Sequence, residues 1–464
     1  MISVDSIFSP GWILPAFALL VAFVFPMFVR LSVRDIALAL SALLIFSNGI
    51  AFRLGDGKLR IEAFVLPVLI GALFSASAFR QARSERSVSG LLPIRASLST
   101  ALAWCWIGSL LATSSVLAPD HLRSIWITGQ ISVSVAIFSL IGALPEPDKK
   151  LFVRAGTFIL ATISAYSVLA RTVPALAGSG FGVSRDGRLI GTALEVNVFS
   201  AELVCWLALM YARRDDLNER RYRFCAAVIA VGVLLGGTRA AWIGLVFAAI
   251  GVAVHTRNGA IRKSIIGCLA SLGLITAVII VAGSGDENTL AWRVLNLTNT
   301  DSSTGAYRLS IYDTAASDIL SSWERLFMGS GANSFSQFHL VDSTNTGSEY
   351  LSSVWLAVVY DSGIVGALFF FMFLILRVLE SKELFSGALV ALVLLICSTT
   401  TNTVWLAFSW TILALIPLKD NLGANRASGD HSPAGVERES EYEKTLYRSQ
   451  SASGHKTRRI ELRS

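Results

Sequence analysis

Apolar runs of about 17 to 25 residues recur along almost the whole chain, and they restrict the fold more than any other feature. A helix of this length crosses a hydrocarbon core of about 30 Å, whereas a helix in a soluble core is usually shorter and carries a polar face. Hydrophobic residues make up 53% of the 464 residues and charged residues only 15%, against about one quarter charged in an ordinary soluble domain. Membrane β-barrels have short alternating segments instead. The sequence therefore predicts an all-α polytopic membrane protein.

The apolar runs predict about twelve or thirteen transmembrane helices. They lie near 11–29, 35–52, 61–79, 96–118, 124–144, 155–171, 195–212, 224–237, 240–255, 264–283, 355–376, 384–400 and 403–417. The first has no basic flank and no small-residue cleavage site, so we expect a retained helix and not a signal peptide. The predicted organisation is N-terminal transmembrane helices (1–283), one large loop (284–354), C-terminal transmembrane helices (355–417) and a disordered tail (418–464).

Basic residues concentrate in alternate connections between the runs, and short loops rich in Lys and Arg stay preferentially in the cytoplasm. These connections hold Arg30 and Arg34, Arg80 to Arg95, Lys149 to Arg154, Arg213 to Arg223, Arg257 to Lys263, and Arg377 to Lys382. The large loop is then periplasmic and the tail cytoplasmic, in a bacterial inner membrane. The basic connection from Arg53 to Arg60 is an exception, because it is predicted to face outward.

The net charge of +7 follows from this loop bias and from the basic tail. The sequence has neither a compact basic domain nor interleaved aromatic residues, the features that would indicate nucleic-acid binding. The sequence also lacks a Walker-type phosphate loop, a Cys-x-x-Cys pair and a His-x-x-x-His pair. We therefore expect no nucleic-acid partner, no cofactor and no metal ion.

Three arginines on the predicted outer side are candidate functional residues. Arg239 lies in the turn GGTRAAW (236–242), on the side of the membrane where basic residues are disfavoured. Arg188 and Arg308 lie in the two polar segments of the same side. A guanidinium presents a planar fork of donors that matches phosphate oxygens, so three of them predict a diphosphate site. The alternative for Arg239 is an interfacial side chain that extends to lipid headgroups.

Four motifs, in this order, resemble those of the O-antigen ligase and O-antigen polymerase superfamily, including its exopolysaccharide polymerases. The first runs from Arg188 to Asn197 and precedes a helix, and the second is TRAAWIG at 238–244. The third combines Arg308 with FMGSG at 327–331, and the fourth is DSGIVGALF at 361–369.

One position differs from the ligases of this superfamily. Ligases carry His followed by Asn, Ser or Gln, then nine residues, then Gly-x-x-Gly. Here Ser352, Ser353, Gly363 and Gly366 keep the spacing, but serine replaces the histidine. A serine at its usual pKa does not accept a proton as imidazole does near neutral pH. The resemblance therefore favours the exopolysaccharide polymerase branch.

The resemblance implies a metal-independent glycosyltransferase that polymerises undecaprenyl-diphosphate-linked oligosaccharide repeat units into a surface polysaccharide or exopolysaccharide. In this interpretation arginines stabilise the leaving lipid diphosphate in place of a metal ion. Glu349 is the preferred proton acceptor, ahead of Asp361 and His339, because it precedes Ser352 by three residues and would share its helical face. The expected catalytic residues are Arg239, Arg308 and Glu349, and the expected substrate-binding residues are Arg188, Asn197, Tyr350, Ser352 and Ser353. Expected partners besides membrane lipids are a flippase and a chain-length regulator.

Two alternative functions remain open. One is ligase-type transfer of a glycan to lipid A-core or to another acceptor. The other is transport of polysaccharide or lipid-linked sugars, since discontinuous helices with glycines and arginines also form transport sites. Against transport, no inverted repeat is evident, and about seventy residues are concentrated in a single outer loop.

Overall fold

The computed structural model describes residues 33–54, 57–71, 97–173, 176, 182–184, 187–257, 259, 262–263, 265–267, 303–339 and 351–419. The chain divides into two units, residues 1–418 and 419–464, and all of the described helices belong to the first. The predicted span 11–29, most of the span 264–283 and most of the tail lie outside the described residues.

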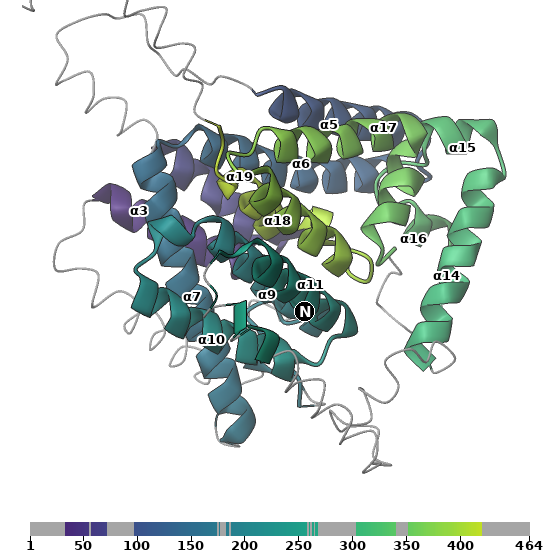
Figure 1. The fold of residues 1–464 in the computed structure, drawn as a ribbon. Helices are drawn as coiled ribbons and strands as arrows, with labels where there is room; N and C mark the ends of the chain where they lie inside the picture. Colours follow the sequence, from purple (N-terminus) through teal and green to yellow (C-terminus); the bar gives the residue numbers. More distant parts are fainter. Residues whose placement is uncertain are drawn as a thin grey trace, which may run out of the picture. The chain divides into compact units, whose positions relative to one another are not determined.

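Helices form most of the described structure (Figure 1). The α-helices are α3 (Val33–Ile45), α5 (Leu98–Val116), α6 (His121–Ala143), α7 (Glu146–Thr172), α9 (Val196–Ala212), α10 (Glu219–Gly236), α11 (Arg239–His255), α14 (Ser303–Leu320), α15 (Trp323–Met328), α16 (Phe335–Phe338), α17 (Val354–Leu379), α18 (Leu384–Cys397) and α19 (Ala407–Leu415). Three short 3-10 helices are η1 (Ile61–Phe64), η2 (Arg214–Asp216) and η3 (Thr403–Trp405). Two antiparallel hairpins pair β1 (Ala51–Leu54) with β2 (Gly57–Arg60) and β3 (Gly182–Val183) with β4 (Leu189–Gly191).

Among the described residues, α6, α7 and α17 are long and apolar enough to cross a membrane. Four shorter helices are also apolar: Ile61–Gly71, α9, α11 and α18. The predicted spans 96–118, 124–144 and 355–376 coincide with α5, α6 and α17 to within a few residues. The all-α polytopic membrane class is therefore confirmed, while the number of spans stays a prediction.

Helix α9 lies in the interior, packed against α10, α11 and α18. Almost all of its residues are buried, because its sequence VNVFSAELVCWLALMYA is apolar on every side. The indole N–H of Trp206 donates to the Thr157 hydroxyl of α7 at 3.0 Å, so the polar atom of this buried ring is paired. This bond ties the middle of α9 to α7, and the candidate site forms around the first turn of α9.

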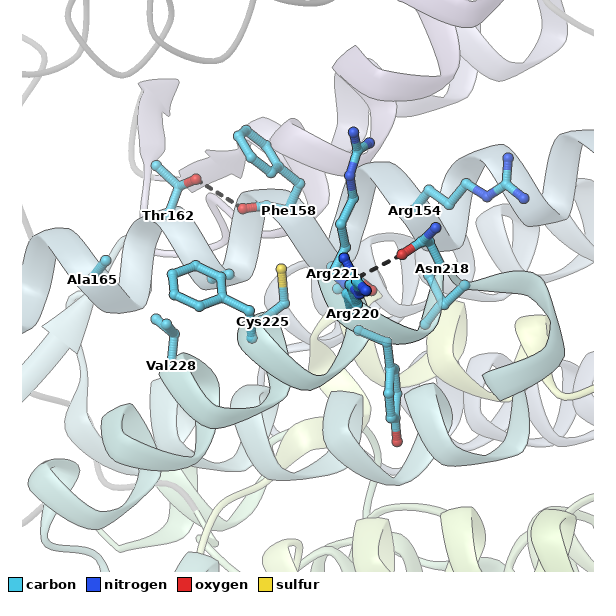
Figure 2. A pocket seen from close by; sticks show the side chains of 14 residues that line it. Arg154, Phe158, Thr162, Ala165, Asn218, Arg220, Arg221, Cys225 and Val228 are labelled. Atoms are coloured by element: carbon cyan, nitrogen blue, oxygen red, sulfur yellow. Dashed lines mark hydrogen bonds between the residues drawn. The ribbon is translucent and has the colours of Figure 1, made fainter.

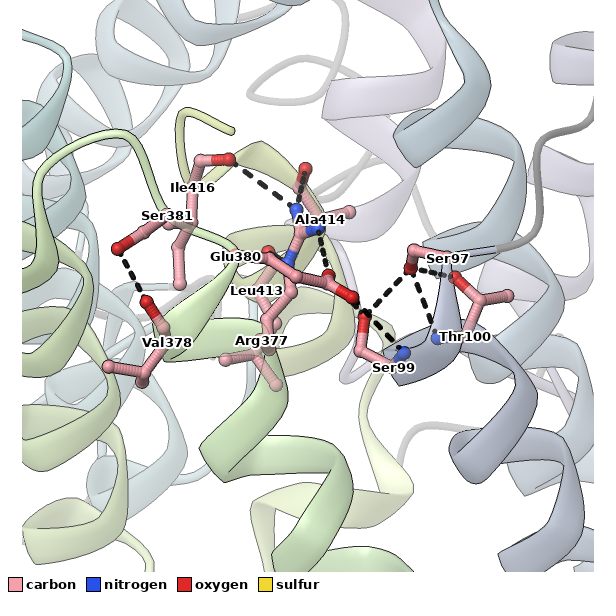
Figure 3. Close-up of polar contacts among 10 residues, drawn as sticks. All are labelled: Ser97, Ser99, Thr100, Arg377, Val378, Glu380, Ser381, Leu413, Ala414 and Ile416. Atoms are coloured by element: carbon pink, nitrogen blue, oxygen red, sulfur yellow. Dashed lines mark hydrogen bonds and ion pairs between the residues drawn. The ribbon is translucent and has the colours of Figure 1, made fainter. Parts of the chain in front are cut away.

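A buried arginine ties α17 to the ends of α19 and α5 (Figure 3). Arg377 donates to the carbonyls of Leu413 and Ala414, each at 2.8 Å, where the end of α19 leaves carbonyls without helical partners. Its neighbour Glu380 accepts a hydrogen bond from the Ser99 hydroxyl at 2.6 Å. Residues from the predicted cytoplasmic loops form ion pairs at this same end: Arg34 with Asp148, Lys150 with Asp216, Arg213 with Glu146, and Arg214 with Glu383.

The large loop docks on a break in α17. Gly363 has φ +64° and ψ −175°, so the helix is interrupted at this residue. The break leaves the carbonyls of Tyr360 and Asp361 available, and they accept hydrogen bonds from the backbone N–H groups of Ser330 (2.8 Å) and Gly331 (2.9 Å). The FMGSG motif of the loop and the DSGIVG motif of the helix are therefore parts of one structural unit.

Two glycines make this contact possible. A Cβ on Gly363 would lie 2.3 Å from the carbonyl oxygen of Phe327, and a Cβ on Gly329 would lie 2.5 Å from the backbone nitrogen of Gly363. Both residues also have positive φ, which side chains disfavour. The two backbones approach this closely only because neither residue has a side chain.

Candidate functional site

The first turn of α9, the turn between α10 and α11, the helix α14 and the connected ends of α17 and α18 meet in one region, which we call the outer site. Ser200 of α9 lies against Gly236 at the end of α10, where a Cβ would be 2.3 Å from the serine oxygen. At the other side, the N–H of Val354 at the start of α17 donates to the carbonyl of Ser398 after α18 at 2.9 Å. Helix α18 packs against both α9 and α11 and so joins the two sides.

Arg308 and Asn197 share one carboxylate in the outer site. Glu195, immediately before α9, interacts electrostatically with the guanidinium of Arg308 on α14. One oxygen of the same carboxylate accepts a hydrogen bond from the side-chain amide of Asn197 at 2.9 Å. The first and third motifs are distant in the sequence, and Glu195 connects them. Sequence analysis missed this residue, although it lies within the first motif.

Ser352, the predicted counterpart of the ligase histidine, contacts α14 through Tyr312. Tyr312 follows Arg308 by four residues and so shares its helical face. Its hydroxyl forms a hydrogen bond with the Ser352 hydroxyl at 3.0 Å and donates to the carbonyl of Thr399 at 3.2 Å. Ser353 is buried and precedes the first residue of α17. Tyr312 was also missed from the sequence, and its helical spacing from Arg308 was the available signal.

Arg239 is the first residue of α11 and is half-buried. The preceding turn is closed by Gly237, which has φ +68°, and by the indole N–H of Trp242, which donates to the carbonyl of Leu234 at 3.2 Å. Among the described residues, the buried hydroxyl of Thr238 has no hydrogen-bond partner. The start of a helix carries partial positive charge, and the arginine adds a full charge, so this turn favours an anion.

Arg188 lies in the turn of the β3–β4 hairpin, directly before β4. Its carbonyl accepts a hydrogen bond from the N–H of Ser184 at 2.8 Å, and its own N–H donates to the Ser184 hydroxyl at 3.1 Å. The strand β4 packs against α9 and α10, next to the outer site. The structure thus joins Arg308 and Asn197 through Glu195, and it links Ser352 to α14 through Tyr312. Arg239 begins α11 and Arg188 directly precedes β4, and both of these elements pack against α9.

A histidine and a carboxylate of the large loop form a pair that the sequence did not predict. Nε2 of His339 lies 2.6 Å from Oδ2 of Asp318, and the hydroxyl of Tyr360 donates to the same oxygen at 3.0 Å. Asp318 follows Tyr312 by six residues, so the pair lies about 9 Å farther along α14 than the contact with Ser352. A carboxylate on one ring nitrogen fixes the orientation of an imidazole, which is the arrangement of a general base.

The matched region includes most of these residues. Residues 224–371 match the family model described as O-Antigen ligase. This segment belongs to the O-antigen ligase and polymerase superfamily. The match confirms the resemblance predicted from the motifs, and it includes Arg239, Arg308, Ser352 and the break at Gly363. No curated protein matches the chain.

Membership of the O-antigen ligase and polymerase superfamily indicates glycan transfer of the ligase or polymerase type, with lipid-linked oligosaccharides as substrates. The matched segment also contains Glu349 and Tyr350, which lie outside the described residues. Residues 351–353 are not helical, so the prediction that Ser352 lies on a helix shared with Glu349 is wrong for Ser352. The role of Glu349 stays a prediction.

Proposed function

We propose that this protein polymerises undecaprenyl-diphosphate-linked oligosaccharide repeat units at the periplasmic face of the bacterial inner membrane. The observation that supports this most is the contact of Tyr312 with Ser352 on the Arg308 face of α14. Tyr312 follows Arg308 by about one helical turn, so this contact links Ser352, the predicted counterpart of the ligase histidine, to the helix that carries Arg308. In this proposal the site holds a phosphate-bearing donor and has a serine at the position of the ligase imidazole.

In the proposed reaction a sugar hydroxyl of one repeat unit attacks the anomeric carbon of another. The bond from that carbon to the diphosphate oxygen breaks, and undecaprenyl diphosphate leaves with the bonding electrons. Arg239, Arg308 and Arg188 stabilise the negative charge on the leaving group, which metal ions stabilise in other enzymes. Asn197, Ser352, Ser353 and Tyr350 bind the sugars through their hydroxyl and amide groups.

The proton of the attacking hydroxyl passes to a base, for which the chain offers two candidates. Glu349 is the candidate from the sequence, and His339 is the candidate from the structure, because Asp318 orients its ring. Both lie in the large loop, which we propose to be periplasmic, between N-terminal helices (1–283) and C-terminal helices (355–417). The tail (418–464) is then cytoplasmic.

Ligase-type transfer, for example to lipid A-core, is the second candidate function, because the matched family model is described as O-Antigen ligase. Ser352 argues against it, since a serine paired with a tyrosine hydroxyl at 3.0 Å stands at the position where the ligases have an imidazole. In the proposed pathway a flippase supplies the lipid-linked repeat units and a chain-length regulator limits the polymer.

The test uses purified protein and lipid-linked repeat units, with a metal chelator and without ATP. We expect chains of two or more units to form, and lipid A-core added in a parallel reaction to remain unmodified. Modification of lipid A-core without chain growth would establish the ligase function instead. Strict dependence on magnesium would contradict charge stabilisation by arginines alone.

Alkaline phosphatase fusions test the orientation. A fusion within 284–354 should be active and a fusion to the tail should be inactive, as the distribution of basic loops requires. The reverse result would place the outer site in the cytoplasm and exclude the proposed reaction.

A further inference from the structure

A groove between α7 and α10 lies away from the outer site and is not used in the proposed reaction. It has a volume of about 950 Å³, at the upper end of the range of about 300 to 1,000 Å³ that ligand sites occupy. Its lining runs from Arg154 to Ala165 along α7 and from Leu217 to Val228 across the start of α10. Figure 2 shows that the side chains with guanidinium groups gather toward one part of the groove and the apolar side chains toward the other.

The charged end of the groove has three arginines from two helices, Arg154, Arg220 and Arg221. Nε of Arg154 donates to the backbone carbonyl of Asp216 at 2.8 Å, which holds this guanidinium at the groove. Among the described residues, Arg220 and Arg221 have no carboxylate partner, whereas Arg223 on the same helix pairs with Glu219. The groove therefore presents positive charge that the described part of the protein does not neutralise.

The other end of the groove is apolar. Phe158, Ala161 and Ala165 line it from α7, and Phe224 and Val228 line it from α10. The rings of Phe158 and Phe224 are exposed, at 44% and 71%, as expected for side chains that face hydrocarbon and not water. A polar ligand such as a nucleotide or a free sugar would leave this surface uncovered.

The length of the groove matches one leaflet of a bilayer. Arg154 and Ala165 are eleven residues apart on α7, which is about 16 Å along a helix, or about half of a hydrocarbon core of about 30 Å. Its arginines lie at the end of the bundle where Lys150 and Asp216 pair, which is the end that the basic loops assign to the cytoplasm. An anion with a hydrocarbon chain of one-leaflet length fits both ends of the groove.

We propose that this groove binds an anionic phospholipid of the cytoplasmic leaflet. Its phosphate lies among Arg154, Arg220 and Arg221, and an acyl chain lies along Phe158, Ala165 and Val228. Because the groove joins α7 to α10, the bound lipid fills a gap between two helices that both contact α9 and β4.

The test measures lipid binding to the purified full chain in detergent by native mass spectrometry. Phosphatidylglycerol is compared with phosphatidylethanolamine, and the double variant Arg220→Gln/Arg221→Gln is compared with the wild type. Each arginine near an anionic lipid contributes about 1 kcal/mol, and 1.4 kcal/mol corresponds to a tenfold change in affinity. The loss of two arginines should therefore weaken phosphatidylglycerol binding about 30-fold. The matched control is Arg223→Gln/Arg257→Gln, which removes the same charge from residues that do not line the groove.

A second pair of variants tests the apolar end without changing charge. Ala165→Phe fills the groove and should lower phosphatidylglycerol binding, whereas Ala227→Phe, at an exposed residue of α10 outside the groove, should leave it unchanged. Equal binding by both double variants would overturn the proposal. The assignment of the occupant would be overturned if the wild type bound phosphatidylethanolamine as tightly as phosphatidylglycerol. Tighter binding of undecaprenyl phosphate than of phosphatidylglycerol would overturn it as well.

Discussion

Replacing Gly363 by alanine is expected to detach the large loop from α17 while leaving the helical bundle in place. The added Cβ would lie 2.3 Å from the carbonyl oxygen of Phe327 and 2.6 Å from the nitrogen of Gly329. Both are backbone atoms, so neither moves aside by a change of rotamer. The loop must withdraw, and the hydrogen bonds from Ser330 and Gly331 to the helix are then lost.

The magnitude follows from two contributions. A residue other than glycine at φ +64° and ψ −175° costs about 1–3 kcal/mol. The loss of two backbone hydrogen bonds, at about 0.5–1.5 kcal/mol each, adds about 1–3 kcal/mol. The docked state is thus disfavoured by about 2–6 kcal/mol, so its equilibrium with an undocked loop shifts about 30-fold or more.

Limited proteolysis of the purified protein measures this shift, with polymer formation as the functional readout. We expect Gly363→Ala to be cleaved faster within 303–339 and to form little polymer. Gly108→Ala on α5 is the control, because a Cβ there meets no atom within 4 Å and alanine favours a helix. Unchanged cleavage and normal polymer from Gly363→Ala would refute the role of this contact.

Three further predictions concern single side chains. Arg239→Lys keeps the charge but loses the bidentate fork, so the reaction barrier should rise by about 2–4 kcal/mol and the rate of polymer formation should fall about thirty-fold to several hundred-fold. Arg257→Lys at equal abundance serves as the control. Near-normal polymer from Arg239→Lys would exclude this arginine from the site. Glu349→Gln and His339→Gln identify the base, because only the variant without the base should lose about 100-fold or more in rate. Full activity of both variants would exclude both residues as the base. Arg377→Met leaves carbonyls of α19 unpaired and removes the ion pair with Glu380, so we expect a loss of about 3–5 kcal/mol in stability, measured as a lower midpoint of thermal unfolding. An unchanged midpoint would show that this end of the bundle does not depend on Arg377.

The membrane class could be predicted from the sequence because hydrophobic length and loop charge are local properties. A run such as 124–144 can satisfy its backbone hydrogen bonds in lipid only as a helix, and α6 indeed covers His121–Ala143. Boundaries set by polar residues were less predictable. Helix α10 begins at Glu219, before the apolar run at 224, because Asn218 caps a polar first turn that continues the helix. The connection Arg53 to Arg60, which was predicted to face outward, belongs to the hairpin of β1 and β2.

The superfamily was also evident in the sequence, because its motifs are short strings with fixed neighbours. The partners of those motifs were not evident, since they depend on which helices pack together. Only the tertiary structure joins Arg308 to Glu195, Tyr312 to Ser352 and His339 to Asp318. The same holds for Gly329 and Gly363, which read as separate turns in the sequence and form one contact in the fold. The physical reason is that helix formation depends on neighbouring residues, whereas a site depends on the register of helices packed from distant parts of the chain.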